Sequence, residues 1–84
     1  MAHSIKYLPS AKKELHALPG NVQKRIITVV RKLKDNTRPS GCKKLKGCDV
    51  YRIRVGDYRV VYEIHDDVLV VLVVRVAHRG KAYQ

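Results

Sequence analysis

The sequence is short of acidic residues and contains no long apolar run. Seven Asp and Glu stand against 18 Lys and Arg in 84 residues, which gives a net charge of +11 and a pI near 10.1. No stretch approaches the roughly 20 apolar residues of a membrane span. No apolar segment at the N-terminus is expected to act as a signal peptide. We therefore expect a cytoplasmic protein with no membrane partner.

Cysteine is equally scarce, because Cys42 and Cys48 are the only two thiols and no histidine stands beside them in the chain. Two thiols cannot supply the four ligands of a structural zinc site. His3, His16 and His65 fall on different expected elements and are expected to face solvent. The sequence thus predicts no metal site and no cofactor. We expect free thiols in a reducing cytoplasm, although a disulfide across the short loop is possible.

The positive charge is unevenly distributed along the chain. Residues 1–48 hold twelve bases and two acids, whereas residues 49–84 hold six bases and five acids. A chain this basic suits a polyanionic partner, either nucleic acid or an acidic protein. A generic solvated basic surface is the plainer alternative. Three lysines stand between the two cysteines, and we take them as candidate RNA contacts: Lys43, Lys44 and Lys46.

The first half of the chain predicts a short strand and two helices. Residues 4–8 alternate like a strand, and Pro9 can begin a helix that ends before Pro19. Gly20-Asn21 offers a break and an N-cap for a second, longer helix. Both helices carry apolar residues at helical spacing, namely Ala11, Leu15 and Leu18 in the first and Val22, Ile26, Val29, Val30 and Leu33 in the second. A loop is expected over 35–47.

The last third predicts strands alone, over 50–55, 58–64 and 68–76, with a two-residue hairpin turn at Gly56-Asp57. The expected order is β-α-α-β-β-β. Such an order is typical of an α+β fold in which one mainly antiparallel sheet carries a two-helix hairpin on one face. We expect residues 1–84 to form a single domain of this kind.

The hairpin turn sets which residues share a face of the sheet. With Gly56-Asp57 as the turn, Arg54 lies opposite Arg59, and Arg52 joins them on that face. The other face then carries core residues, namely Tyr51, Ile53, Val55, Tyr58, Val60 and Tyr62. Because opposed like charges destabilise a strand pair, three clustered arginines indicate an anion-binding site. Pairing with nearby carboxylates is the alternative.

The C-terminal segment adds a second group of polar side chains, His78, Arg79, Lys81 and Tyr83. His78 can titrate near neutral pH and Tyr83 could stack on a base. Beside the arginines, these residues suggest an active site that acts on a phosphodiester.

Two stretches, 51–62 (YRIRVGDYRVVY) and 78–83 (HRGKAY), resemble the RelE branch of the RelE/ParE toxin superfamily. The Leu18-Pro19 break and the Lys44–Gly47 entry to the sheet are similar too. The resemblance implies the toxin of a type II toxin–antitoxin system, a ribosome-dependent, metal-independent endoribonuclease that cuts mRNA in the A site and inhibits translation. It implies that the 2′-hydroxyl attacks the adjacent phosphate.

The resemblance also assigns roles to individual residues. Arg52 and Arg54 match positions that handle the attacking hydroxyl, and Arg59 matches the residue that stabilises the transition state. Arg79 would assist the leaving oxygen, and Tyr83 would orient the substrate. Two positions that carry lysine in the best-described member carry arginine here, and arginine is a poor general base. His78 therefore becomes our main candidate for proton transfer, with Lys81 as a further phosphate contact.

The implied partners are a cognate antitoxin, the ribosome and mRNA, with operator DNA reached only through the antitoxin complex. Val70 and Leu72 should share the face of Val61, which leaves an apolar floor that an acidic amphipathic antitoxin segment could cover. Two other functions remain open. A ParE-like DNA gyrase inhibitor shares this fold, and a non-catalytic RNA-binding module would need the charge alone.

Overall fold

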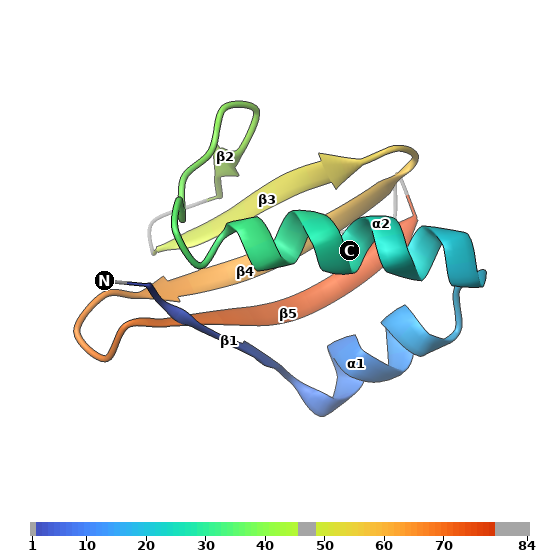
Figure 1. The fold of residues 1–84 in the computed structure, drawn as a ribbon, viewed down its shortest axis with the longest axis horizontal. Helices are drawn as coiled ribbons and strands as arrows, with labels where there is room; N and C mark the ends of the chain where they lie inside the picture. The colour runs from blue at the N-terminus through green and yellow to red at the C-terminus, as the bar shows by residue number, and fades with distance from the viewer. Residues whose placement is uncertain (1, 46–48, 79–84) are drawn as a thin grey trace.

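The computed structural model describes residues 2–45 and 49–78, which form two helices and one five-stranded sheet (Figure 1). The strands are β1 (Ser4–Tyr7), β2 (Lys43–Lys44), β3 (Val50–Val55), β4 (Tyr58–His65) and β5 (Val70–His78). Their order in the sheet is β1-β5-β4-β3-β2, with β1 parallel to β5 and all other neighbours antiparallel. The predicted α+β class and mainly antiparallel sheet are confirmed.

Helix α1 spans Pro9–His16 and begins at a proline, whose missing N–H costs nothing in the first turn. Its Ala11 and Leu15 are buried as their spacing predicts. Helix α2 spans Gly20–Lys32 and begins two residues earlier than it would with Asn21 as its N-cap. The N-cap prediction is wrong because the backbone carbonyl of Pro19 itself accepts the first amide hydrogen bonds of the helix.

The core lies between α2 and one face of the sheet (Figure 1). The buried face of α2 contributes Ile26 and Val30, and Leu33 follows directly after the helix. The hairpin register pairs Tyr51 with Tyr62 and Val55 with Tyr58, as predicted from the turn. The whole predicted core face of β3 and β4 packs into this cluster, namely Tyr51, Ile53, Val55, Tyr58, Val60 and Tyr62.

Two expectations for the strands need correction. The predicted loop over 35–47 contains β2, because Lys43 and Lys44 pair with Arg52 and Tyr51 of β3. The final strand begins at Val70, since the turn after β4 runs through Leu69, which has a positive φ of 54°. Such short strands and turn lengths depend on contacts that a local pattern does not contain.

Strand β5 contains a bulge in its pairing with β4. Val61 pairs with Arg75 while Tyr62 pairs with Val73, so Val74 is the extra residue. A bulge of one residue reverses which face each following side chain takes. Next to the bulge, Arg75 Nε lies 3.3 Å from Oε2 of Glu14 on α1.

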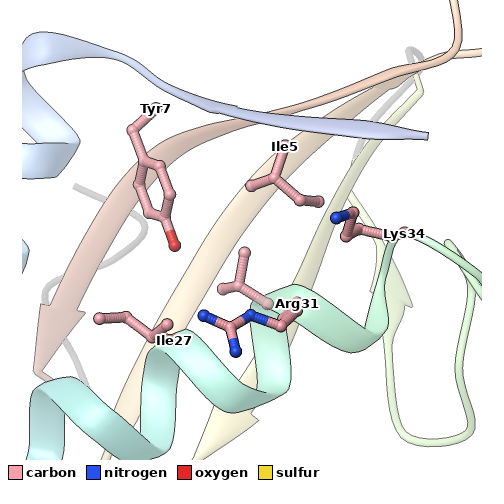
Figure 2. A pocket seen from close by; sticks show the side chains of 6 residues that line it. Ile5, Tyr7, Ile27, Arg31 and Lys34 are labelled. Carbon is pink, nitrogen blue, oxygen red and sulfur yellow. The ribbon is translucent and has the colours of Figure 1, made fainter. Parts of the chain in front are cut away.

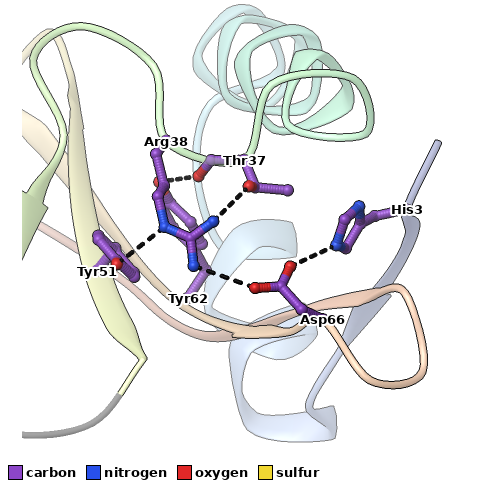
Figure 3. Close-up of polar contacts among 6 residues, drawn as sticks. All are labelled: His3, Thr37, Arg38, Tyr51, Tyr62 and Asp66. Atoms are coloured by element: carbon purple, nitrogen blue, oxygen red, sulfur yellow. Dashed lines mark hydrogen bonds and ion pairs between the residues drawn. The ribbon is translucent and has the colours of Figure 1, made fainter. Parts of the chain in front are cut away.

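A polar network joins the N-terminus to two loops (Figure 3). Arg38 donates from Nε to the Tyr51 hydroxyl at 3.0 Å and from Nη2 to Asp66 Oδ2 at 3.2 Å. His3 Nε2 lies 3.0 Å from Asp66 Oδ1. The side chain of His3 is only 13% exposed, so the expectation that it faces solvent is wrong. These hydrogen bonds, the one with His3 more than the one with Arg38, hold the pKa of Asp66 below its usual value.

No helix in the described part of the chain is long and apolar enough to cross a membrane.

Candidate functional site

The face of the sheet away from the helices carries the three predicted arginines. Arg54 on β3 pairs directly with Arg59 on β4, and Arg52 pairs with Val61. Residues directly opposite on antiparallel strands share a face, with Cβ atoms roughly 5 Å apart. Arg52 and Arg59 are half-buried, and Arg54 is exposed. The predicted placement of these arginines is confirmed, and we call this surface the arginine face.

An apolar floor lies beside the arginines on the same face. Val61 and Ala77 are 5% and 8% exposed, and three partly buried residues pack against them, Leu45, Val50 and Val74. Val70 and Leu72 pair with His65 and Glu63, which alternate with Val61, so they share its face as predicted. Apolar surroundings strengthen the attraction between a bound anion and a neighbouring guanidinium group.

The two described lysines of the loop are placed on different faces. Lys43 pairs with Arg52 and therefore joins the arginine face, whereas Lys44 pairs with Tyr51 and lies on the helix side. Both side chains are exposed at the edge of the sheet. Only Lys43 is thus positioned to meet a ligand bound at the arginines.

His78 does not stand with the arginines. It pairs with Tyr58, whose ring is on the core face, and the two rings meet edge to face with centroids 5.3 Å apart. The bulge at Val74 is the reason, since strict alternation from Val70 would have placed His78 on the arginine face. The geometry therefore contradicts the expected position of His78 beside Arg59.

His65, which was expected only to face solvent, lies on the arginine face instead. His65 alternates with Val61 and Glu63 along β4, and its Nε2 lies 2.8 Å from Glu63 Oε1. Strand alternation alone could have placed it there. Six residues separate His65 from Arg59, which is roughly 20 Å along a strand. The His65–Glu63 pair thus lies outside reach of a group bound between Arg54 and Arg59.

The remaining predicted site residues lie outside the described residues, and they are Lys46, Arg79, Lys81 and Tyr83. Across residues 2–45 and 49–78, no group of three or more His, Cys, Asp and Glu side chains is arranged to hold a metal ion.

A separate hollow lies between β1 and α2, on the helix side of the sheet (Figure 2). Ile5 and Ile27 contribute to its apolar wall, and Arg31 and Lys34 are the cations at its margin. The hydroxyl of Tyr7 points toward α2 there, and burial raises the pKa of this phenol. Its volume is about 190 Å³, below the roughly 300 Å³ of small-molecule sites. The hollow is therefore smaller than a typical nucleotide site.

The arginine face can bind and stabilise a phosphate group. Guanidinium groups present fork-shaped donors that match two phosphate oxygens at once. Arg52, Arg54 and Arg59 come from two adjacent strands, so their backbone positions are held by the hydrogen bonds of the hairpin. Two helices packed on one face of a five-stranded sheet, with three arginines on the opposite face, define a small α+β protein with a basic sheet surface.

Comparison with known proteins places the chain in a family. The family model described as ParE toxin of type II toxin-antitoxin system, parDE, matches residues 5–83. Toxin RelE3 of Methanocaldococcus jannaschii is 36% identical over 76 residues, which cover 84% of each chain. The chain therefore belongs to the ParE toxin family of type II toxin–antitoxin systems, and within this superfamily it is a RelE-family toxin.

Solved structures agree with this assignment. The archaeal RelE–RelB complex from Pyrococcus horikoshii matches with a TM-score of 0.87 at 30% identity, covering 98% of this chain and 100% of that one. A mutant of the E. coli toxin RelE in the free state matches with a TM-score of 0.85 at 27% identity, covering 99% of this chain and 90% of that one. The resemblance inferred from the two motifs is confirmed.

Proposed function

We propose that this toxin is a ribosome-dependent, metal-independent endoribonuclease that cuts mRNA in the ribosomal A site and stops translation in the cytoplasm. One observation carries the proposal, which is the direct pairing of Arg54 with Arg59 on the arginine face, with Arg52 beside them. Repulsion between two directly paired cations such as Arg54 and Arg59 weakens the pairing of their strands. An anionic substrate bound between Arg54 and Arg59 would offset this repulsion.

The proposed reaction is an internal phosphoryl transfer. The 2′-oxygen of the RNA forms a bond to the adjacent phosphorus, and the bond from phosphorus to the 5′-oxygen of the next nucleotide breaks. The products are a 2′,3′-cyclic phosphate and a free 5′-hydroxyl. Negative charge grows on the phosphoryl oxygens in the transition state, and Arg59 and Arg54 stabilise it there. Fixed charges at such a position typically contribute several kcal/mol to the barrier reduction.

Proton removal from the 2′-hydroxyl needs a group other than the arginines, because a guanidinium stays protonated. We assign this role to Lys43, since it lies directly opposite Arg52 on the arginine face. An amine can accept a proton in its neutral form. His78 lies on the opposite face, against Tyr58.

The C-terminal residues complete the proposed site. Arg79 would deliver positive charge or a proton to the leaving 5′-oxygen, and Tyr83 would stack on a base and orient the substrate. Lys46 and Lys81 would contact neighbouring phosphates.

A cognate antitoxin is the proposed partner. Several structural relatives are described as complexes with RelB antitoxins. The apolar floor around Val61 and Ala77 lies beside the arginines, so one acidic amphipathic segment could cover the floor and neutralise the cations together. Operator DNA would be reached only through the toxin–antitoxin complex.

The test is cleavage of mRNA on ribosomes by purified toxin and by Arg59→Ala, with Arg59→Lys as a variant that keeps the charge. We expect codon-positioned cuts with wild type, their loss with Arg59→Ala, and partial activity with Arg59→Lys. Intact mRNA with the wild-type toxin, under conditions where a known RelE cuts, would refute the proposal.

A gyrase inhibitor is the second candidate, because the matching family model bears the ParE name. Such a toxin acts on a protein and does not need opposed arginines at a phosphate site. Growth arrest with trapped gyrase–DNA cleavage and no new mRNA ends would favour it. If the protein is a non-catalytic RNA-binding module, the wild type should not cleave mRNA. Arg59→Ala should then change only its binding to ribosomes and RNA.

A further inference from the structure

A shallow groove lies at the open edge of the sheet, beyond the arginine face. Its walls are the middle of α2, with Lys24, Arg25 and Val29, and the end of β3, with Arg54 and Val55. The groove has a volume of about 440 Å³. Strand β2 pairs with β3 only at Tyr51 and Arg52, so the described chain places no strand along this edge farther on.

The groove is cationic and is not neutralised from within the described residues. Three of its lining residues are bases, and none is an acid. The ion-paired carboxylates of residues 2–45 and 49–78 are Glu14, Glu63 and Asp66, and their partners lie elsewhere. The Thr28 hydroxyl donates to the carbonyl oxygen of Lys24 at 2.8 Å. The Thr28 hydroxyl proton is therefore already used in that hydrogen bond. The side chains of Lys24, Arg25 and Arg54 are the donors left for a ligand in the groove.

Arg25 holds a defined position over the hairpin turn. Both Nη atoms of Arg25 lie 3.4 Å from the point where a Cβ would stand on Gly56, which has a φ of +61°. A Cβ there would be in ordinary van der Waals contact with the guanidinium group, so Arg25 lies directly over the turn. Since Gly56 directly follows β3, Arg25 reaches from the helix to the same edge that carries Arg54.

Arg54 connects this groove to the arginine face. Its Cα pairs with Arg59 on that face, while Arg54 also lines the groove beside α2. A row of positive charge therefore runs from Arg59 through Arg54 to Arg25 and Lys24, around the open edge of β3. A polyanion bound at the arginines can continue into the groove without crossing an acidic residue that lines it.

We propose that this groove binds the phosphate backbone of RNA that extends from the arginine face. The inference rests on the proposed function in that RNA is the substrate, and it adds a second contact surface away from the reacting phosphate. The lining favours a nucleic-acid backbone over a peptide, because three of its seven residues are bases, none is acidic or aromatic, and the groove is open to solvent. Protein interfaces are centred on buried apolar or aromatic side chains.

The experiment measures RNA binding separately from cleavage. The probe is a single-stranded 2′-O-methyl RNA, which lacks the attacking hydroxyl, and the readout is its affinity for the full-length toxin over a series of salt concentrations. The test variant is K24A/R25A. The matched control is K12A/K13A, which removes the same charge from α1, a helix packed against β5. Circular dichroism checks that both variants are folded.

Each single-stranded phosphate contact contributes about 0.7 to the slope of log K against log salt. We expect K24A/R25A to lower the magnitude of that slope by about 1.4 and to weaken binding by at least tenfold near 0.1 M salt. K12A/K13A should change the salt slope and the binding affinity by less than half as much as K24A/R25A does. Equal effects of the two variants would overturn the proposal, since net charge alone would then explain the loss.

Two further outcomes separate this inference from the proposed function. If wild type cuts ribosome-bound mRNA while K24A/R25A binds the RNA probe normally, the groove proposal fails and the function stands. If K24A/R25A loses RNA affinity but no variant or wild type cuts mRNA, the groove is supported and the nuclease proposal fails. Unchanged RNA binding with weakened binding of an acidic antitoxin segment would assign the groove to a protein and refute the inference.

Discussion

Arg54 and Arg59 are direct partners across the β3–β4 hairpin, so two like charges occupy one row of the arginine face. Such a pair destabilises a sheet, whereas a bound phosphate would be stabilised by it. Stability and function therefore place opposite demands on this row.

Replacing Arg54 by threonine should separate these demands. Threonine suits a strand and removes the repulsion. We expect Arg54→Thr to raise the free energy of unfolding by about 0.5 kcal/mol and to lower cleavage of ribosome-bound mRNA at least tenfold. Urea denaturation of the free toxin measures the first effect, and the gain should shrink at high salt because screening weakens the repulsion. A loss of stability would contradict the argument.

Lys43 and Lys44 are adjacent in the chain and face opposite sides of the sheet. We expect Lys43→Ala to lower the cleavage rate by about 100-fold or more, the contribution typical of a general base. Lys44→Ala should change it by less than about threefold. Single-turnover rates over a pH range test the assignment. If Lys43 accepts the proton, the rise in rate with pH should disappear in Lys43→Ala, and equal effects of both variants would count against it.

His78 packs against Tyr58 on the helix side, which predicts a structural role. We expect His78→Gln to keep the cleavage rate within about threefold of wild type. The edge-to-face contact should account for about 0.5–1.5 kcal/mol of stability, by analogy with aromatic pairs. Thermal unfolding and mRNA cleavage, measured on the same preparation, test both parts. A 100-fold loss of cleavage in a folded variant would restore His78 as a proton-transfer group.

Asp66 should make stability depend on acid pH. Because His3 and Arg38 lower its pKa in the folded protein, the carboxylate stabilises the fold above its ordinary pKa near 4. This contribution disappears as the pH falls through the lowered value. Asp66→Asn should therefore be less stable than wild type at pH 7, and the difference should disappear once the pH falls below the lowered pKa of Asp66.

The neighbouring Asp67 provides a matched control, since it lies in the same turn and forms no ion pair within the described residues. The free energy of unfolding of Asp67→Asn should equal that of wild type both at pH 7 and at acid pH. If both variants behave alike over the pH range, the network in Figure 3 does not stabilise the fold.

Glu14 joins α1 to the part of β5 that follows the bulge. Its Oε1 accepts a hydrogen bond from the Val76 amide at 2.9 Å, and its Oε2 pairs with Arg75. We expect Glu14→Ala to lower the free energy of unfolding by about 1–3 kcal/mol, because the amide of Val76 loses its partner. Glu14→Gln keeps an acceptor and should cost about half as much. Hydrogen exchange at Val76 should accelerate in Glu14→Ala and much less in Glu14→Gln.

Local patterns were sufficient for the helices and the central hairpin. The apolar spacing of α2 predicts its buried side because a helix repeats every 3.6 residues. The Gly56-Asp57 turn predicts every pair of β3 and β4, since a two-residue turn leaves one register. The three arginines of the candidate site follow directly from that register.

Tertiary structure decided the rest of the candidate site. Lys43 lies on the arginine face because β2 pairs with the edge of β3. A strand of two residues carries too little pattern to be predicted from the sequence. His78 lies with Tyr58 because of the extra residue Val74, which reversed the alternation of β5. A strand pattern assumes an unbroken period of two. It therefore cannot anticipate a bulge whose contact between Arg75 and Glu14 comes from a helix 61 residues earlier in the chain.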